Sequence, residues 1–114
     1  MTTIDILKKT KAAWKSICNA SAETKNTMLL AMADSLERNR ALILVENRAD
    51  MDAARGHISD VMLDRLYLDE KRLAGMAEGV RAIAALPDHT GRILSEVHRP
   101  NGMTIYKKQV PLGL

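Results

Sequence analysis

The hydrophobic pattern of this chain changes its period once, near Gly91, and this change separates two kinds of local structure. Before Gly91, apolar residues recur three and four positions apart, as they do on one face of an α-helix. After it, apolar and polar residues alternate from Ile93 to His98, which is typical of a β-strand. We therefore expect four or five helices in the first part and β-structure in the second.

Residues with known capping preferences indicate where the helices begin and end. Ser, Thr and Asp favour helix N-termini, and Gly favours the position just after a helix. The expected boundary residues are Thr2 with Asp5, Ser21, Asn39, Gly56, Ser59 and Asp69. In the last helix, the spacing of Gly75 and Gly79 predicts close packing of another helix.

The alternating segment predicts a hairpin over residues 92–109. Pro100-Asn101-Gly102 is expected to be its turn, because both Asn and Gly accept positive φ. Strict alternation places Ile93 and Val97 on one face and Leu94 on the other. Residues 110–114 are then expected to begin an apolar strand whose partner strands lie elsewhere. This pattern predicts that the chain is the N-terminal piece of a larger protein.

Composition limits the functional classes. The chain has 114 residues, enough for one domain, with 3% aromatic residues and no Phe, so its core must consist of aliphatic residues and Met. The net charge of +3 is too mild to indicate a nucleic-acid binder. A single cysteine, no apolar run long enough to span a bilayer and no signal-peptide block predict a cytoplasmic protein without a membrane partner.

The sequence contains no recognisable active site. Cys18 lies on the apolar side of the first expected helix, where a free cysteine acts as a small hydrophobic residue, so we interpret it as structural. His57, His89 and His98 lack zinc-ligand spacing, and neither a Gly-x-Gly-x-x-Gly nor a Walker sequence is present. We therefore expect no catalytic, cofactor-binding or metal site within these residues.

A binding module is the alternative to an enzyme. The first expected helix carries Lys8, Lys9, Lys11 and Lys15, largely off its apolar side. Such a row could contact an acidic partner or a nucleic acid, but no aromatic residues alternate with it to stack on bases. A solvated helix face is therefore the preferred interpretation, and a free-standing helical module remains the second hypothesis.

A series of short motifs, in a fixed order, provides a more specific indication. They are Lys25-Asn26, Asn47 with Asp50, Met62-Leu63-Asp64-Arg65-Leu66 with Leu68, Arg72-Leu73, Met76-Ala77 with Gly79, Arg81, Leu86-Pro87-Asp88 with Gly91, Pro100-Asn101-Gly102-Met103 with Ile105, and Val110-Pro111-Leu112-Gly113. Together they resemble the N-terminal portion of gamma-glutamyl phosphate reductase, also called glutamate-5-semialdehyde dehydrogenase, of the aldehyde dehydrogenase superfamily. His89-Thr90 and Lys108-Gln109 depart from the family pattern at turn or edge positions.

The resemblance implies an α/β fold with a Rossmann-like cofactor domain, of which residues 1–91 are a helical part. It implies an oxidoreductase of proline biosynthesis that reduces gamma-glutamyl phosphate to glutamate 5-semialdehyde with NADPH and releases phosphate. The nucleophilic cysteine of the family is expected beyond Leu114, so this chain alone should be inactive and bind no cofactor. Glutamate 5-kinase is the pathway partner that the resemblance suggests.

The resemblance also implies that the hairpin of residues 92–109 is an arm through which subunits associate into a homo-oligomer. We expect residues 110–114 to begin the first strand of the cofactor-binding sheet. The residues predicted to form the interface are Ile93, Val97, Met103, Ile105, Tyr106, Val110 and Leu112. No nucleic acid is expected among the partners.

Overall fold

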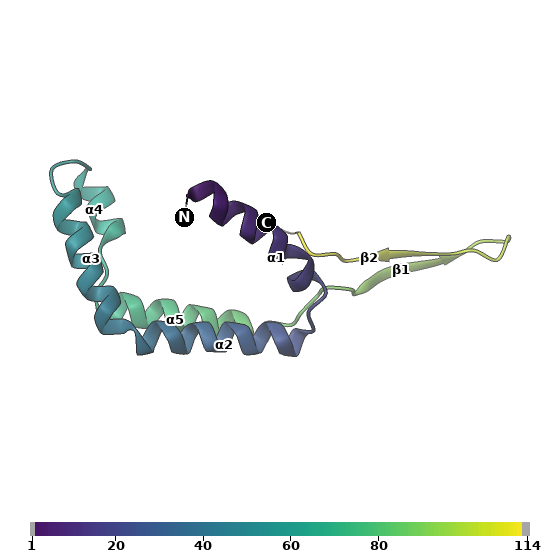
Figure 1. The fold of residues 1–114 in the computed structure, drawn as a ribbon. Coiled ribbons are helices and arrows are strands. Elements are labelled where there is room, and N and C mark those ends of the chain that lie inside the picture. The colour runs from purple at the N-terminus through teal and green to yellow at the C-terminus, as the bar shows by residue number, and fades with distance from the viewer. Residues whose placement is uncertain (1, 113–114) are drawn as a thin grey trace. The chain divides into compact units, whose positions relative to one another are not determined.

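In the computed structural model, residues 2–112 are described, and they form five helices followed by a two-stranded antiparallel sheet (Figure 1). The elements are α1 (Thr3–Cys18), α2 (Ala22–Arg38), α3 (Arg40–Ala54), α4 (Asp60–Leu66), α5 (Glu70–Ala84), β1 (Ile93–His98) and β2 (Thr104–Lys108). The predicted organisation, helices and then a hairpin, is confirmed. The contacts divide the chain into two units, Met1–Ala22 with Pro87–Leu114, and Glu23–Leu86.

Three of the predicted helix caps, at Thr2, Ser59 and Asp69, are formed by the expected side chains. Thr2 and Asp5 form a reciprocal capping box, in which Thr2 N–H donates to the Asp5 carboxylate at 2.9 Å. Ser59 Oγ accepts from Met62 N–H at 3.4 Å, and Asp69 Oδ1 accepts from Arg72 N–H at 2.7 Å. Each contact satisfies a backbone donor that the first turn of a helix leaves unpaired, which explains why these boundaries were predictable.

The chain bends at Asn39, as expected, and α2 and α3 are separate helices. The Asn39 amide donates to the Ser35 carbonyl at 2.8 Å, so the side chain satisfies one of the last carbonyls of α2. Gly56 has a φ of +81°, in the left-handed region that favours glycine, and it follows the end of α3. The C-terminal ends of α2 and α3 are therefore each explained by a residue next to them in the sequence.

In the unit Glu23–Leu86, α2 and α5 lie side by side (Figure 1) and are joined by an ion-pair cluster. Arg81 of α5 donates to both carboxylate oxygens of Glu37, at 2.9 and 2.8 Å, and to Asp34 at 3.0 Å. Beneath this cluster, the small core contains Ala33 of α2 with Leu73, Ala77 and Ala84 of α5. Small side chains of this kind allow two helices to pack closely.

We expect this cluster to make the α2–α5 pairing sensitive to acid. The hydrogen bond from Arg81 lowers the pKa of Glu37 below its ordinary value of 4.5. A carboxyl group with a lowered folded-state pKa stabilises the fold above its unfolded pKa, and this contribution is lost as the pH falls through the folded pKa. Thermal unfolding followed by circular dichroism should therefore show a larger decrease in Tm, from pH 7 to about pH 3, for the natural chain than for Glu37→Gln.

Glu78→Gln is the matched control for this experiment, because Glu78 is an exposed glutamate of α5 without an ion pair among residues 2–112. Its acid sensitivity should equal that of the natural chain. An equal decrease in Tm for Glu37→Gln and the natural chain would contradict the role given to Glu37.

Asn47 of α3 makes two long-range hydrogen bonds, one to the last residue of α4 and one to the connection between α4 and α5. Its amide nitrogen donates to the Leu66 carbonyl at 2.8 Å, and its amide oxygen accepts from Leu68 N–H at 2.8 Å. The residue is only 8% exposed. Because both polar atoms of the side chain are used, Asn47 holds the connection between α4 and α5 against α3 without leaving a buried group unsatisfied.

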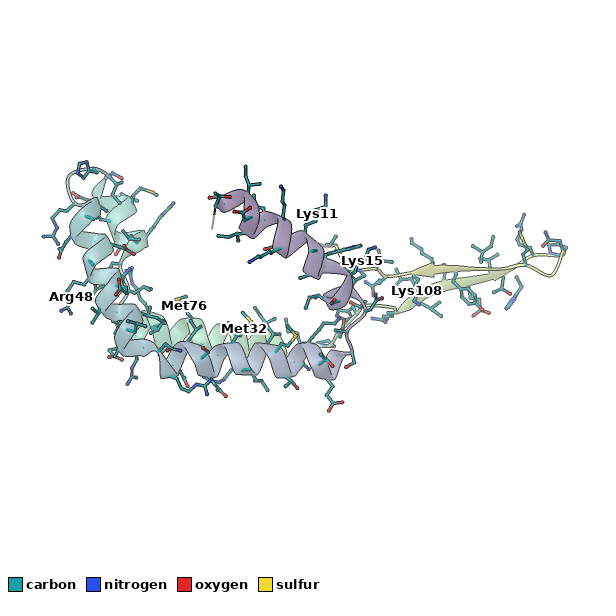
Figure 2. The ribbon with its side chains drawn as sticks, viewed as in Figure 1. Lys11, Lys15, Met32, Arg48, Met76 and Lys108 are labelled. Atoms are coloured by element: carbon teal, nitrogen blue, oxygen red, sulfur yellow. The ribbon has the colours of Figure 1, made fainter. Side chains whose placement is uncertain are left out.

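The accessible surface of the chain is much larger than that expected for compact protein of the same mass. Its accessible surface is 9422 Å². Even two separate compact bodies of half this mass would together expose only about 7,500 Å². Figure 2 shows Met32 and Met76 standing off the same side of the α2–α5 pair. Both are about half exposed, and α1 buries none of its residues.

Gly75 and Gly79 do not mark close helix packing among residues 2–112, because a Cβ atom at either position would meet nothing within 4 Å. The glycine spacing predicted a contact that requires a neighbouring helix, and none lies there. None of the described helices is long and apolar enough to cross a lipid bilayer.

Candidate functional site

The hairpin arm, residues 92–109, is the candidate functional site. Its turn lies at Pro100-Asn101-Gly102 as expected, but only Gly102 of the Asn-Gly pair has a positive φ. Gly102 N–H donates to the Arg99 carbonyl at 3.0 Å, and Arg99 N–H donates to the Met103 carbonyl at 2.8 Å. Gly102 has a φ of +84°, whereas Asn101 does not have a positive φ. This is a three-residue loop that ends in a left-handed glycine, not a two-residue Asn-Gly turn. Pro100 is the physical reason, because its ring fixes a negative φ at the first turn position.

Strict alternation is also wrong at the base of the arm, where Leu94 forms a β-bulge. Ser95 pairs with Lys107 and Ile93 with Lys108, so two steps along β1 match one step along β2. Cross-strand partners share a face of the sheet, and Lys107 and Lys108 lie on opposite faces. Ile93 therefore lies on the face opposite Val97, which corrects the expectation that the two share a face.

The arm has apolar side chains on both faces. Val97 pairs with Ile105 on one face, and Tyr106 pairs with Glu96 on the other. All of the predicted interface residues are exposed, with fractions from 47% for Val97 to 105% for Leu112. They are Ile93, Val97, Met103, Ile105, Tyr106, Val110 and Leu112. A single two-stranded ribbon cannot cover these residues itself, so they are available for contact with further protein.

The strand predicted over residues 110–114 can be followed only in its described part, residues 110–112. Val110 to Leu112 belong to no helix or strand, and Gly113 and Leu114 lie outside the described residues. At the base of the arm, the side-chain oxygen of Gln109 is buried without a hydrogen-bond donor among residues 2–112. This acceptor is an orphan of the kind that a neighbouring polypeptide could satisfy.

A cleft of about 340 Å³ lies between α3 and the segment that leads into α5. Its apolar lining includes Leu44, Met51 and Leu68. Its charged lining consists of Arg48, Asp52, Arg55, Asp69 and Glu70. Three acids against two arginines leave this rim with a net negative charge, and Asp69 already caps α5. The cleft is therefore poorly suited to a phosphate group.

Arg72 of α5 is a structural residue that holds the connection between α4 and α5. Its guanidinium donates to the backbone carbonyls of Asp64 and Tyr67 and to the Asp64 carboxylate, the last at 2.7 Å. It also lies 5.2 Å from the centroid of the Tyr67 ring. Asn47 and Arg72, two of the motif residues, therefore hold the helical unit together.

The remaining candidate residues do not come together. Cys18 is a free, half-buried thiol at the end of α1. His98 at the arm contacts Thr104 at 3.1 Å and Glu96 at 3.0 Å. Within residues 2–112, no three His, Cys, Asp or Glu side chains are grouped so that they could hold a metal ion.

The lysines of α1 lie along an exposed helix. Lys8, Lys11 and Lys15 follow one another at helical spacing, and Figure 2 shows Lys11 and Lys15 on this helix. Every residue of α1 before Cys18 is exposed. The interpretation of this helix as a binding module for an acidic partner or a nucleic acid stays a prediction.

Comparison with curated proteins gives close relatives. The chain is 56% identical over 104 residues to gamma-glutamyl phosphate reductase of Neisseria gonorrhoeae, and 52% identical over 104 residues to the protein of that name from Streptococcus pneumoniae strain G54. In both cases the match covers 91% of this chain and 25% of the relative. The chain therefore spans about a quarter of the length of these relatives. No protein-family model matches it.

Solved structures give the same result at the level of the backbone. The crystal structure of gamma-glutamyl phosphate reductase from Thermotoga maritima matches with a TM-score of 0.86 and 30% identity, over 95% of this chain and 26% of that one. The enzyme of that name from Saccharomyces cerevisiae matches with a TM-score of 0.84 and 25% identity, over 97% and 29% of the two chains. The resemblance predicted from the sequence motifs is confirmed.

Proposed function

We propose that this chain, which is related along most of its length to the gamma-glutamyl phosphate reductases, is the helical scaffold and hairpin arm of such an enzyme. The intact protein would reduce gamma-glutamyl phosphate to glutamate 5-semialdehyde with NADPH and release phosphate, in the cytoplasm, one step after glutamate 5-kinase. The observation that carries the proposal is identity above 50% to proteins of that name over 104 residues. As the N-terminal portion, the chain would precede the residues that perform the reaction.

The described residues do not fit a role in binding NADPH. They contain no glycine-rich phosphate loop, and the cleft beside the N-terminus of α5 has a negative rim. Cys18 is the single cysteine of the chain and lies half-buried at the end of α1, so we do not assign it the role of the nucleophile. We therefore assign the covalent step and the hydride transfer to the part of the intact enzyme that this chain does not include.

The proposed role of this chain is mechanical: it supplies surface for the rest of the enzyme and for a neighbouring subunit. Its accessible surface of 9422 Å² exceeds that of two compact bodies of half its mass by about 2,000 Å². An excess of this size matches the surface that obligate interfaces bury. In this proposal the helices pack against the cofactor domain, and the hairpin arm joins subunits into a homo-oligomer.

A chimera tests this function directly. The 104 residues of this chain that match the Neisseria gonorrhoeae protein replace the corresponding residues of that reductase. We expect the chimera to oxidise NADPH with gamma-glutamyl phosphate at a rate within about tenfold of the parent enzyme, whereas the isolated chain should show no turnover. NADPH absorbance at 340 nm is the assay, and the parent enzyme is its positive control.

Turnover by the isolated chain would contradict the scaffold proposal. A chimera that folds with the parent's circular dichroism spectrum but has no activity would contradict the functional assignment.

A further inference from the structure

We propose that Asn101 is a site of spontaneous deamidation, in which the backbone nitrogen of Gly102 displaces the side-chain amide, and that the hydrogen bond from Gly102 to Arg99 controls the rate. The reacting groups are a side chain and a backbone nitrogen of this chain, and water is the only other reactant. Both reacting residues belong to the turn that connects β1 and β2 (Figure 1), so the reaction is independent of the proposed function.

The reaction requires an asparagine followed by a residue whose backbone nitrogen is open to attack. The Gly102 nitrogen loses its proton and forms a bond to the side-chain carbonyl carbon of Asn101. The bond from that carbon to the amide nitrogen breaks, and ammonia leaves with the proton. Water then opens the resulting succinimide ring at either carbonyl, which gives aspartate or isoaspartate, and no group is oxidised or reduced.

Asn101 is the only one of the five asparagines that precedes a glycine. Glycine has no Cβ atom to crowd its own backbone nitrogen. The other four asparagines precede alanine, threonine or arginine, and they lie in helices or at helix ends, where hydrogen bonds along the helix hold the backbone. They are Asn19, Asn26, Asn39 and Asn47. The sequence therefore provides one reactive position and four internal controls.

Two hydrogen bonds of the turn act on the reacting atoms in opposite directions. Met103 N–H donates to the side-chain oxygen of Asn101 at 3.1 Å, which holds the side chain against its own backbone and polarises its carbonyl group. Gly102 N–H donates to the Arg99 carbonyl at 3.0 Å, so the proton that must leave is already engaged. The first bond prepares the carbon for attack, and the second keeps the nitrogen from reacting until it opens.

Deamidation would change both the charge and the backbone of the arm. Residues 92–109 contain four arginines and lysines and one acid, so their net charge is +3, and either product lowers it to +2 by adding a carboxylate. Isoaspartate also directs the chain through the former side chain, which adds a backbone atom to a three-residue turn. We therefore expect the isoaspartate form to lose the hydrogen bond between Gly102 and Arg99 and to open the nearest strand pair, His98 with Thr104.

The test follows the full 114-residue chain in mildly alkaline buffer, with its tryptic peptides separated by reversed-phase chromatography and identified by mass. Asn101 lies in the peptide of residues 93–107, because trypsin does not cleave before Pro100. We expect aspartate and isoaspartate forms of this peptide to accumulate at least about tenfold faster than products of the other four asparagines. A blocked peptide of residues 98–104, too short to keep a hairpin, should react about fivefold faster than the folded chain, the factor that one ordinary hydrogen bond provides.

Pro100→Ala tests the control by the turn without altering either reacting residue. It frees φ at the first turn position, so it should speed the reaction about threefold or more in the folded chain and by less than about twofold in the blocked peptide. Gly102→Ala should slow the reaction about tenfold in the blocked peptide, because its own Cβ atom crowds the attacking nitrogen. Cross-strand nuclear Overhauser effects between Val97 and Ile105 verify that the Pro100→Ala chain keeps its hairpin.

The proposal is overturned if the peptide of residues 93–107 gains neither product, or if the other asparagines react equally fast. It is also overturned if the blocked peptide reacts no faster than the folded chain, or if Pro100→Ala leaves the rate in the folded chain unchanged. An inactive chimera would refute the proposed function and leave this reaction untouched.

Discussion

Asn47→Ala is expected to destabilise the helical unit by about 2–4 kcal/mol, because it leaves the Leu66 carbonyl and the Leu68 N–H without their partner. The alanine side chain has no polar atom to replace either bond, and the site is too enclosed for full hydration. Urea unfolding followed by circular dichroism measures the free energy of unfolding. Hydrogen exchange at the Leu68 amide gives a local measurement. In the variant, this amide should exchange faster than the backbone amides of α5.

Asn19→Ala serves as the control for this substitution. Asn19 is exposed and donates only to the nearby Lys15 carbonyl, at 3.0 Å, so its loss should change the free energy of unfolding by no more than about 0.5 kcal/mol. Equal effects of the two substitutions would show that the Asn47 hydrogen bonds do not hold the α4–α5 connection.

Leu73→Ala is expected to cost about 2–5 kcal/mol of stability, the range found when a buried leucine is truncated and a cavity remains. Leu73 is the only large side chain among the described residues that is fully buried, at 1% exposure. A core that contains one large residue and several alanines has no neighbouring side chain of sufficient length to fill the space. The midpoint of urea unfolding is the measurement.

Leu42→Ala is the matched control, with the same chemical change in a helix of the same unit. Leu42 is 60% exposed, so its truncation should have an effect several times smaller than that of Leu73→Ala. If both variants unfold at the same urea concentration, the helical unit does not depend on the core described here.

The local features of this fold were predictable, and the long-range ones were not. Thr2, Ser59 and Asp69 were identified as caps because a cap is a contact between residues two or three positions apart. The contacts of Asn47 join residues 19 and 21 positions away, and nothing in the neighbouring sequence distinguishes it from a surface asparagine. Its role could be found only once α3 and the α4–α5 connection were placed together.

The arm shows the same division between local and non-local information. Its existence and its turn region followed from the alternation and from Asn101-Gly102, yet the turn type required weighing Pro100 against the Asn-Gly preference. The bulge at Leu94 depends on how two strands align, and a period-two pattern contains no signal for it. The candidate interface residues are exposed, and their role in an interface stays a prediction. The face assigned to Ile93 was wrong.

The Arg81 cluster also fixes how far α5 can slide along α2. Asp34 and Glu37 are three residues apart and so lie on successive turns, and a single guanidinium reaches both. Displacing one helix by a full turn, about 5.4 Å, would carry Arg81 out of reach of at least one carboxylate. The alanines between the helices are nearly uniform in shape and would tolerate such a slip. The ion pairs of Arg81 therefore select a single register of α5 along α2.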